Sequence, residues 1–177
     1  MQPIVFLIDA VISFFCTLFL LRFMMQAMRV SFSGQLGEFV VKLTNWGVKP
    51  LRRIIPGFAG MDWSSVFAAF ALQALLTGIV VSLSRQLGEV DFGAILPMIL
   101  WYALRALLRL SVYIFIGALL LQAVLSWINP YSPLAGPAGQ LTRPILNPIR
   151  RFIPTISGID LSPLVAILLL QVVLMFL

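Results

Sequence analysis

The sequence contains no histidine, one cysteine and few charged residues. Without histidine, the chain lacks the side chain that most often acts as a general base near neutral pH and as a zinc ligand. Neither a cluster of metal-ligating residues nor a glycine-rich phosphate loop is found. The single Cys16 has no partner for an intrachain disulfide and is expected to be buried as a small apolar side chain. We therefore predict no catalytic residues, no cofactor and no metal.

The shortage of charge also argues against a soluble domain. Only 10% of the residues are charged and 61% are hydrophobic, against roughly 25% charged in an ordinary soluble domain. About 17–25 apolar residues cross a hydrocarbon core. Four segments have that length: residues 4–28, 64–83, 104–128 and 161–177. The first lacks the basic start of a signal peptide and should be retained, so we predict a single all-α membrane domain over residues 1–177.

A 16-residue segment occurs twice, 98 residues apart. Residues 50–65 read PLRRIIPGFAGMDWSS and residues 148–163 read PIRRFIPTISGIDLSP, with eight identities. The charged identities are the arginine pairs and the aspartates that follow them: Arg52, Arg53 and Asp62, then Arg150, Arg151 and Asp160. The repeat predicts two units of span, basic loop and span, about residues 1–83 and 104–177, joined by a connector over 84–103.

The orientation of these units follows from counting basic residues. A unit with two spans must point the same way as its copy, so both basic loops should lie on one side of the membrane. Those two loops hold eight Lys and Arg residues, whereas the connector and its flank hold three. Since positive loops stay inside, we predict a bacterial inner-membrane protein with cytoplasmic basic loops and periplasmic termini.

The two basic loops differ in their predicted local structure, and the third span is ambiguous. In the first loop, Leu36, Phe39, Val40 and Leu43 follow helical spacing, which predicts a short amphipathic helix at the inner membrane surface. The second loop carries five prolines and should be an interfacial segment of mostly extended chain. Residues 95–128 are too long for one upright span. We place the third span at 104–128 with 95–103 as an interfacial approach; one strongly tilted helix is the alternative.

Within the repeated segment, the proline before each arginine pair favours the first turn of a short helix. Gly60 and Gly158 permit a reversal of the backbone, and Ser64 and Ser162 are expected as helix N-caps. The segment has three possible roles: a topological anchor, a pair of sites for anionic lipid headgroups or an acidic partner segment, or part of an ion path.

Charges inside the spans raise questions of pairing. Arg22 is expected either to reach the interface or to form a buried pair with Asp62 or Asp160. Asp9 and Arg109 fall at equal depth in the repeat alignment, so we predict that they approach each other. For the repeated arginines, we favour pairing with the aspartate of the same unit over exchange between units, because closing a short loop costs less entropy.

The order of spans and the doubled P-x-RR-x-I-P-x-x-x-G-x-D-x-S pattern resemble the YggT (YlmG-like) family of small bacterial and plastid membrane proteins. The resemblance covers nearly the whole chain. It implies a part in osmotic and ionic stress tolerance, in division, or in the assembly of membrane complexes, and it implies no catalytic residues. The chain departs from the pattern at Ser65, where the second copy has Pro163, and at Gln122, where an arginine is more typical.

Two classes of function remain open at this point. We favour a non-enzymatic accessory protein that contacts anionic lipids, a second copy of itself or another membrane protein. The net charge of +6 fits anionic lipid better than nucleic acid, because basic and aromatic residues do not interleave on a soluble face. The alternative is a small ion channel or transporter that needs oligomerisation for a pore. Intramembrane hydrolysis by Asp62 and Asp160 is disfavoured, because the neighbouring arginines stabilise their carboxylates.

Overall fold

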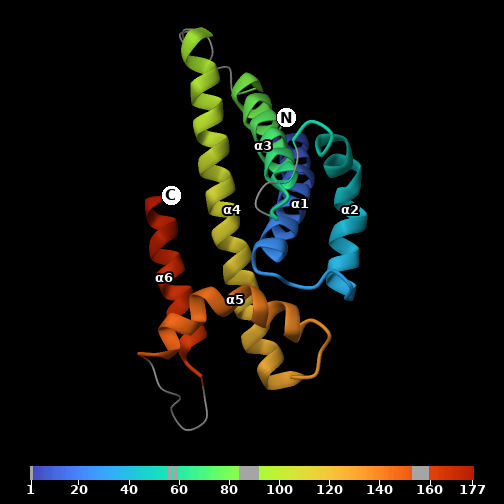
Figure 1. Ribbon diagram of the computed structural model, residues 1–177. Helices are drawn as coiled ribbons and strands as arrows, with labels where there is room; N and C mark the ends of the chain where they lie inside the picture. Colours follow the sequence, from blue (N-terminus) through green and yellow to red (C-terminus); the bar gives the residue numbers. More distant parts are fainter. Residues whose placement is uncertain (1, 56, 58–59, 84–91, 153–159) are drawn as a thin grey trace.

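The structure, a computed structural model, describes residues 2–55, 57, 60–83, 92–152 and 160–177. In these ranges the regular elements are all helices, as predicted (Figure 1). They are α1 (Gln2–Ala27), α2 (Gln35–Leu51), α3 (Trp63–Leu83), α4 (Phe92–Ile128), α5 (Ala135–Arg150) and α6 (Ser162–Phe176). The connector residues 84–91 and Gly158 lie outside the described residues.

Three of the helices are long and apolar enough to cross a membrane: Pro3–Ala27, Trp63–Leu83 and Ile95–Ile128. The first two agree with the predicted spans, and the third contains the predicted span 104–128 but begins earlier. The fourth predicted span is the apolar helix α6, which has 15 residues. At 1.5 Å per residue it is about 22 Å long, less than a hydrocarbon core of about 30 Å. The chain is thus a helical membrane protein with three candidate spans and one shorter apolar helix.

The third span does not begin at residue 104 as we predicted. Helix α4 runs without a break through 37 residues from Phe92 to Ile128, about 55 Å, so the single long helix is correct. Pro97 is the sixth residue of this helix, where it removes one helical hydrogen bond. The packing face continues across residue 104: Ile99 lies beside Gly78 of α3, and Ala103 and Leu107 are buried.

The amphipathic helix predicted in the first basic loop is present as α2. Its buried positions, Val40, Thr44 and Val48, recur every four residues and therefore share one face. That face packs along α1, where the ring of Phe19 approaches Gly47. Phe39, which we placed on the apolar face, is half exposed instead.

The second basic loop is not extended, and this prediction was wrong. Residues Ala135–Arg150 form helix α5, with Pro144 and Pro148 inside it. Pro148 has no N–H and stands four residues after Pro144, so the carbonyl left without a helical donor is that of Pro144. The buried Leu141 and Leu146 then pack the helix onto the core. The free energy gained by burying these side chains outweighs the cost of the prolines. A count of prolines alone therefore overestimates how strongly they oppose a helix here.

The core is built around α1, which packs between α2 and α3. Helices α1 and α3 run antiparallel: Phe23 contacts Trp63 near one end, and the thiol of Cys16 donates to the carbonyl of Ala69 further along. Cys16 and Ala69 are completely buried, as expected for Cys16. Helix α4 lies against α3, and α5 and α6 pack together on the lower half of α4 in the view of Figure 1. The start of α3 is thereby fixed beside α1 and α2.

Candidate functional site: two arginine–aspartate turns

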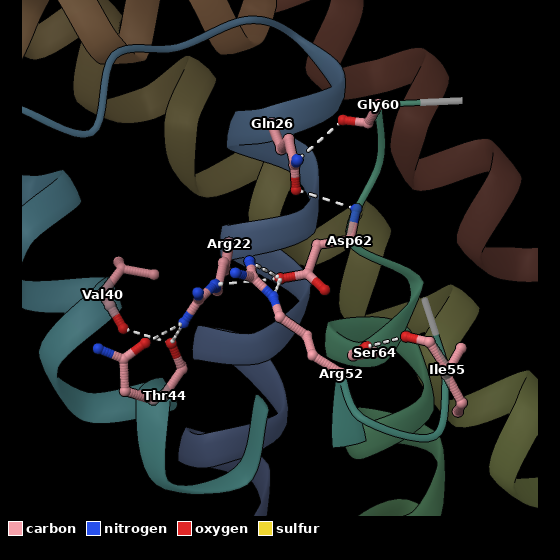
Figure 2. Close-up of polar contacts among 10 residues, drawn as sticks. Arg22, Gln26, Val40, Thr44, Arg52, Ile55, Gly60, Asp62 and Ser64 are labelled. Carbon is pink, nitrogen blue, oxygen red and sulfur yellow. Dashed lines mark hydrogen bonds and ion pairs between the residues drawn. The ribbon is translucent and has the colours of Figure 1, made fainter. Parts of the chain in front are cut away.

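The first copy of the repeated segment is organised around the carboxylate of Asp62, which directly precedes α3 (Figure 2). One oxygen, Oδ2, accepts hydrogen bonds from Nε and Nη2 of Arg52 at 3.1 and 2.5 Å. The Nε of Arg22, from α1, lies 3.6 Å from the same oxygen. The Asp62 side chain is 2% exposed and that of Arg22 7%, whereas that of Arg52 is 51% exposed. One buried carboxylate therefore faces two guanidinium groups.

The turn before Asp62 is held by Gln26, a residue that the sequence analysis did not single out. Gly60 has a φ of 74°, which supports the predicted reversal. The amide of Gln26 donates to the carbonyl of Gly60 at 2.8 Å, and its oxygen accepts the backbone N–H of Asp62 at 3.0 Å (Figure 2). Gln26 thus joins the end of α1 to the turn and fixes the position of Asp62 relative to α1.

Two local predictions about this segment were wrong. Ser64 does not cap α3, because its hydroxyl donates to the carbonyl of Ile55 at 2.9 Å and so closes the loop. Pro50 does not begin a new helix but lies in the last turn of α2. Hydrogen bonds continue past it, from the N–H of Arg52 to Val48 and from that of Ile55 to Leu51. The arginine pair therefore follows a helix end, and Arg52 extends back toward Asp62.

The second copy repeats the ion pair in a more open setting. Nε and Nη2 of Arg150 donate to Oδ2 of Asp160 at 2.9 and 2.7 Å, with side chains 43% and 30% exposed. The N-cap of α6 is Leu161, not the predicted Ser162, and Oδ1 of Asp160 accepts the backbone N–H of Ser162 at 2.9 Å. Burial works to raise the pKa of Asp160, but the bonds from Ser162 and the charge of Arg150 outweigh it and leave that pKa lowered. Both pairs are local, as we predicted.

The two copies differ in the residue that the first span contributes. Nη1 of Arg22 donates to Oγ1 of Thr44 at 2.7 Å and to Oδ1 of Asn45 at 3.1 Å. At the matching place in the second half, Thr142 donates to Gln122. The sequence analysis missed the role of the threonines, although Thr44 and Thr142 also recur 98 residues apart. Among the residues that the structure describes, the first copy therefore brings a second cation to its aspartate and the second copy does not.

Four of the singled-out charges stay apart from these clusters. Arg53 and Arg151 are exposed, and within the described ranges neither forms an ion pair. The predicted approach of Asp9 and Arg109 is not formed, and both side chains are exposed. Arg109 instead lines a groove between α3 and α4.

Comparison with known proteins agrees with the doubled pattern. The family model described as CCB3/YggT matches residues 1–84 and 101–177. The chain belongs to the CCB3/YggT family. Among relatives, the uncharacterized protein YggT of Escherichia coli K12 is 34% identical over 98% of this chain and 88% of its own length. An uncharacterized Pseudomonas aeruginosa protein is 34% identical over 96% and 85%, and one from Vibrio alginolyticus 36% over 97% and 91%.

No solved structure matches the chain. The two segments matched by the CCB3/YggT model each contain one arginine–aspartate turn, Arg52 with Asp62 and Arg150 with Asp160. The residues between them include the connector and the first turns of α4. Both turns therefore lie in the parts of the chain that the family model matches. The names of the relatives give no function for these turns.

Proposed function

We propose that this member of the CCB3/YggT family is a non-enzymatic accessory protein of the bacterial inner membrane that binds anionic lipid headgroups at its arginine–aspartate turns. The proposed role is in envelope homeostasis under osmotic or ionic stress, or in the assembly of membrane complexes and division. The observation that supports it most is the buried carboxylate of Asp62, which is shared by Arg22 and Arg52.

The first turn carries more positive charge than its carboxylate can balance. Arg22 and Arg52 contribute two positive charges against one negative charge of Asp62, and the exposed Arg53 adds a third positive charge. Half of the Arg52 side chain is accessible, so a headgroup phosphate can reach its guanidinium. The planar fork of arginine suits phosphate oxygens, and the hydrogen bond to Asp62, which raises the pKa of Arg52, keeps it charged.

Space for such a headgroup exists on both sides of Arg52. A cavity of about 200 Å³ is lined by Arg22, Gln26 and Arg52 together with Phe32 and Val41. A second cavity of about 310 Å³ is lined by Gln26, Arg52 and Asp62 with the residues of the Gly60 turn. Apolar walls beside guanidinium groups are the combination that a lipid at the membrane interface needs.

The membrane arrangement that goes with this proposal has two parallel units and four membrane-embedded helices. In it, both turns face the cytoplasmic leaflet, whose anionic lipids attract basic segments by about 1 kcal/mol per Lys or Arg. The Lys and Arg count supports this orientation.

The proposal is tested by photocrosslinking in living cells from positions 53 and 151, which are exposed and next to the paired arginines. We expect position 53 to capture phosphatidylglycerol or cardiolipin more than position 151 does. Position 127, exposed on α4, is the matched control. Capture of one defined membrane protein with no lipid would replace the headgroup with an acidic partner segment, and equal lipid capture at all three positions would contradict the proposal.

A further inference from the structure

Two further arginines lie in a groove at the opposite end of α3 from Asp62. The geometry points to a second lipid site there, in which Arg105 and Arg109 of α4 hold the phosphate of an anionic phospholipid in the other leaflet. This site is separate from the turn at Arg52, because its residues come from the C-terminal end of α3 and the first half of α4.

The groove lies between α3 and α4 and has a volume of about 450 Å³. Its lining includes Thr77 and Val80 of α3, and Tyr102, Arg105, Ala106 and Arg109 of α4. The two arginines stand four residues apart, so their side chains leave the same face of the helix. Both arginine side chains therefore line one groove that also has apolar walls.

Within the described residues, Arg109 is exposed and forms no ion pair, whereas Arg105 donates to the backbone oxygen of Leu177. Both lie inside a helix segment of 34 residues that is otherwise apolar enough to span a membrane. Since an arginine within a span is costly unless its charge reaches the interface or meets an opposite charge, an anion from outside the protein is the expected partner of Arg109.

The depth of the groove matches the level of lipid headgroups. Helix α3 has 21 residues, about 31 Å, which equals the thickness of a hydrocarbon core. Thr77 and Val80 lie in its last two turns, so the groove opens near the end of the span at Leu83. Long arginine side chains reach from such a position to the interface, and the exposed Trp101 and Tyr102 are typical of that level.

The chemistry of the groove fits a phospholipid better than a free anion. Arg105 and Arg109 supply two forks for phosphate oxygens, and Tyr102 adds a hydroxyl. Val80 and Ala106 form an apolar wall along which an acyl chain can lie. A free phosphate would use only the polar part of this lining, whereas a lipid uses both parts.

Binding can be measured on the purified full-length protein in a neutral detergent by native mass spectrometry during titration with phosphatidylglycerol. The variants are Arg105→Gln, Arg109→Gln and both together, and Arg143→Gln, an exposed arginine of α5, is the matched control. We expect phosphatidylglycerol to bind about fivefold more weakly after each single change and about thirtyfold more weakly after both. Arg143→Gln should leave phosphatidylglycerol binding unchanged, and the variant with Arg105→Lys and Arg109→Lys should retain most of it.

Several results would overturn this assignment. One is unchanged phosphatidylglycerol affinity in the double Gln variant, and another is an equal loss in Arg143→Gln. Displacement of the lipid by inorganic phosphate would assign the groove to a free anion, and equal binding of phosphatidylcholine would remove the role of the charge. If the double Gln variant does not fold, the two single Gln variants and the variant with Arg105→Lys and Arg109→Lys test whether these charges bind the lipid.

Discussion

Arg22 in α1 and Asp62 at the start of α3 lie 3.6 Å apart and are both almost completely buried, although forty positions separate them in the sequence. This pair fixes the turn of the first half against the first span. In the second half, Gln122 stands at the matching place and accepts a hydrogen bond from Thr142 instead. Two segments of equal net charge therefore differ in their surroundings, because in the described residues Arg22 adds a second guanidinium beside Asp62 and no such group lies beside Asp160.

The first prediction concerns the cost of breaking the Arg22–Asp62 pair. Asp62→Asn leaves two guanidinium groups facing no charge, so we expect a loss of about 3–5 kcal/mol in the free energy of unfolding. Arg22→Gln should cost less, because Asp62 keeps Arg52. The double variant should lose less than the sum of the two. Unfolding in detergent, followed by circular dichroism, checks this; additive losses would show that the two residues do not interact.

The second prediction uses the difference between the two turns. Exchanging the charges in the second half, with Arg150→Asp and Asp160→Arg, should restore much of the folded yield lost in either single variant, because the pair is local. The same exchange at Arg52 and Asp62 should not restore it, because the new arginine would face Arg22. Yields from matched membrane preparations provide the measurement. Equal rescue in both halves would mean that Arg22 does not contribute to the first turn.

The third prediction concerns acid. The folded pKa of Asp160 is lowered, so its ionised form stabilises the protein above the ordinary carboxyl pKa of about 3.9. That contribution, about 1 kcal/mol or less for so exposed a pair, is lost as the pH falls below this value through the folded pKa. The difference in thermal midpoint between the unchanged protein and Asp160→Asn should therefore shrink in acid. Asp9→Asn is the control, and a difference independent of pH would exclude the charged pair as its cause.

The fourth prediction is the orientation of the chain. In a variant with Cys16 replaced by Ala, a new cysteine at Gly139 should be protected from an impermeant thiol reagent in intact cells, and one at Gln2 should react. Gly139 lies on the basic helix α5, which belongs on the cytoplasmic side by the distribution of Lys and Arg. The reverse labelling pattern would place the arginine–aspartate turns outside and remove them from the anionic cytoplasmic leaflet.

Run lengths and spacing predicted much of the fold, because membrane crossing and amphipathic burial depend on local composition. They predicted the spans at α1 and α3, the helix α2 and the local pairs of Arg52 with Asp62 and Arg150 with Asp160. They failed where packing overrides a local rule. Helix α5 forms in spite of its prolines, and α4 continues through Pro97. The roles of Gln26 and Thr44 depend on how α1 meets α2 and the turn before α3, which no single segment specifies.

The central claim is that the surplus charge at Asp62 makes the first turn the stronger headgroup site. The most direct measurement is phosphatidylglycerol affinity by native mass spectrometry. It is made in a variant with Arg105→Gln and Arg109→Gln, which lacks the charges of the groove between α3 and α4. We expect Arg52→Gln to weaken binding about fivefold. Arg150→Gln, which removes the same charge from the second turn, should change it little. Equal effects of the two substitutions, or no effect of Arg52→Gln, would contradict the account.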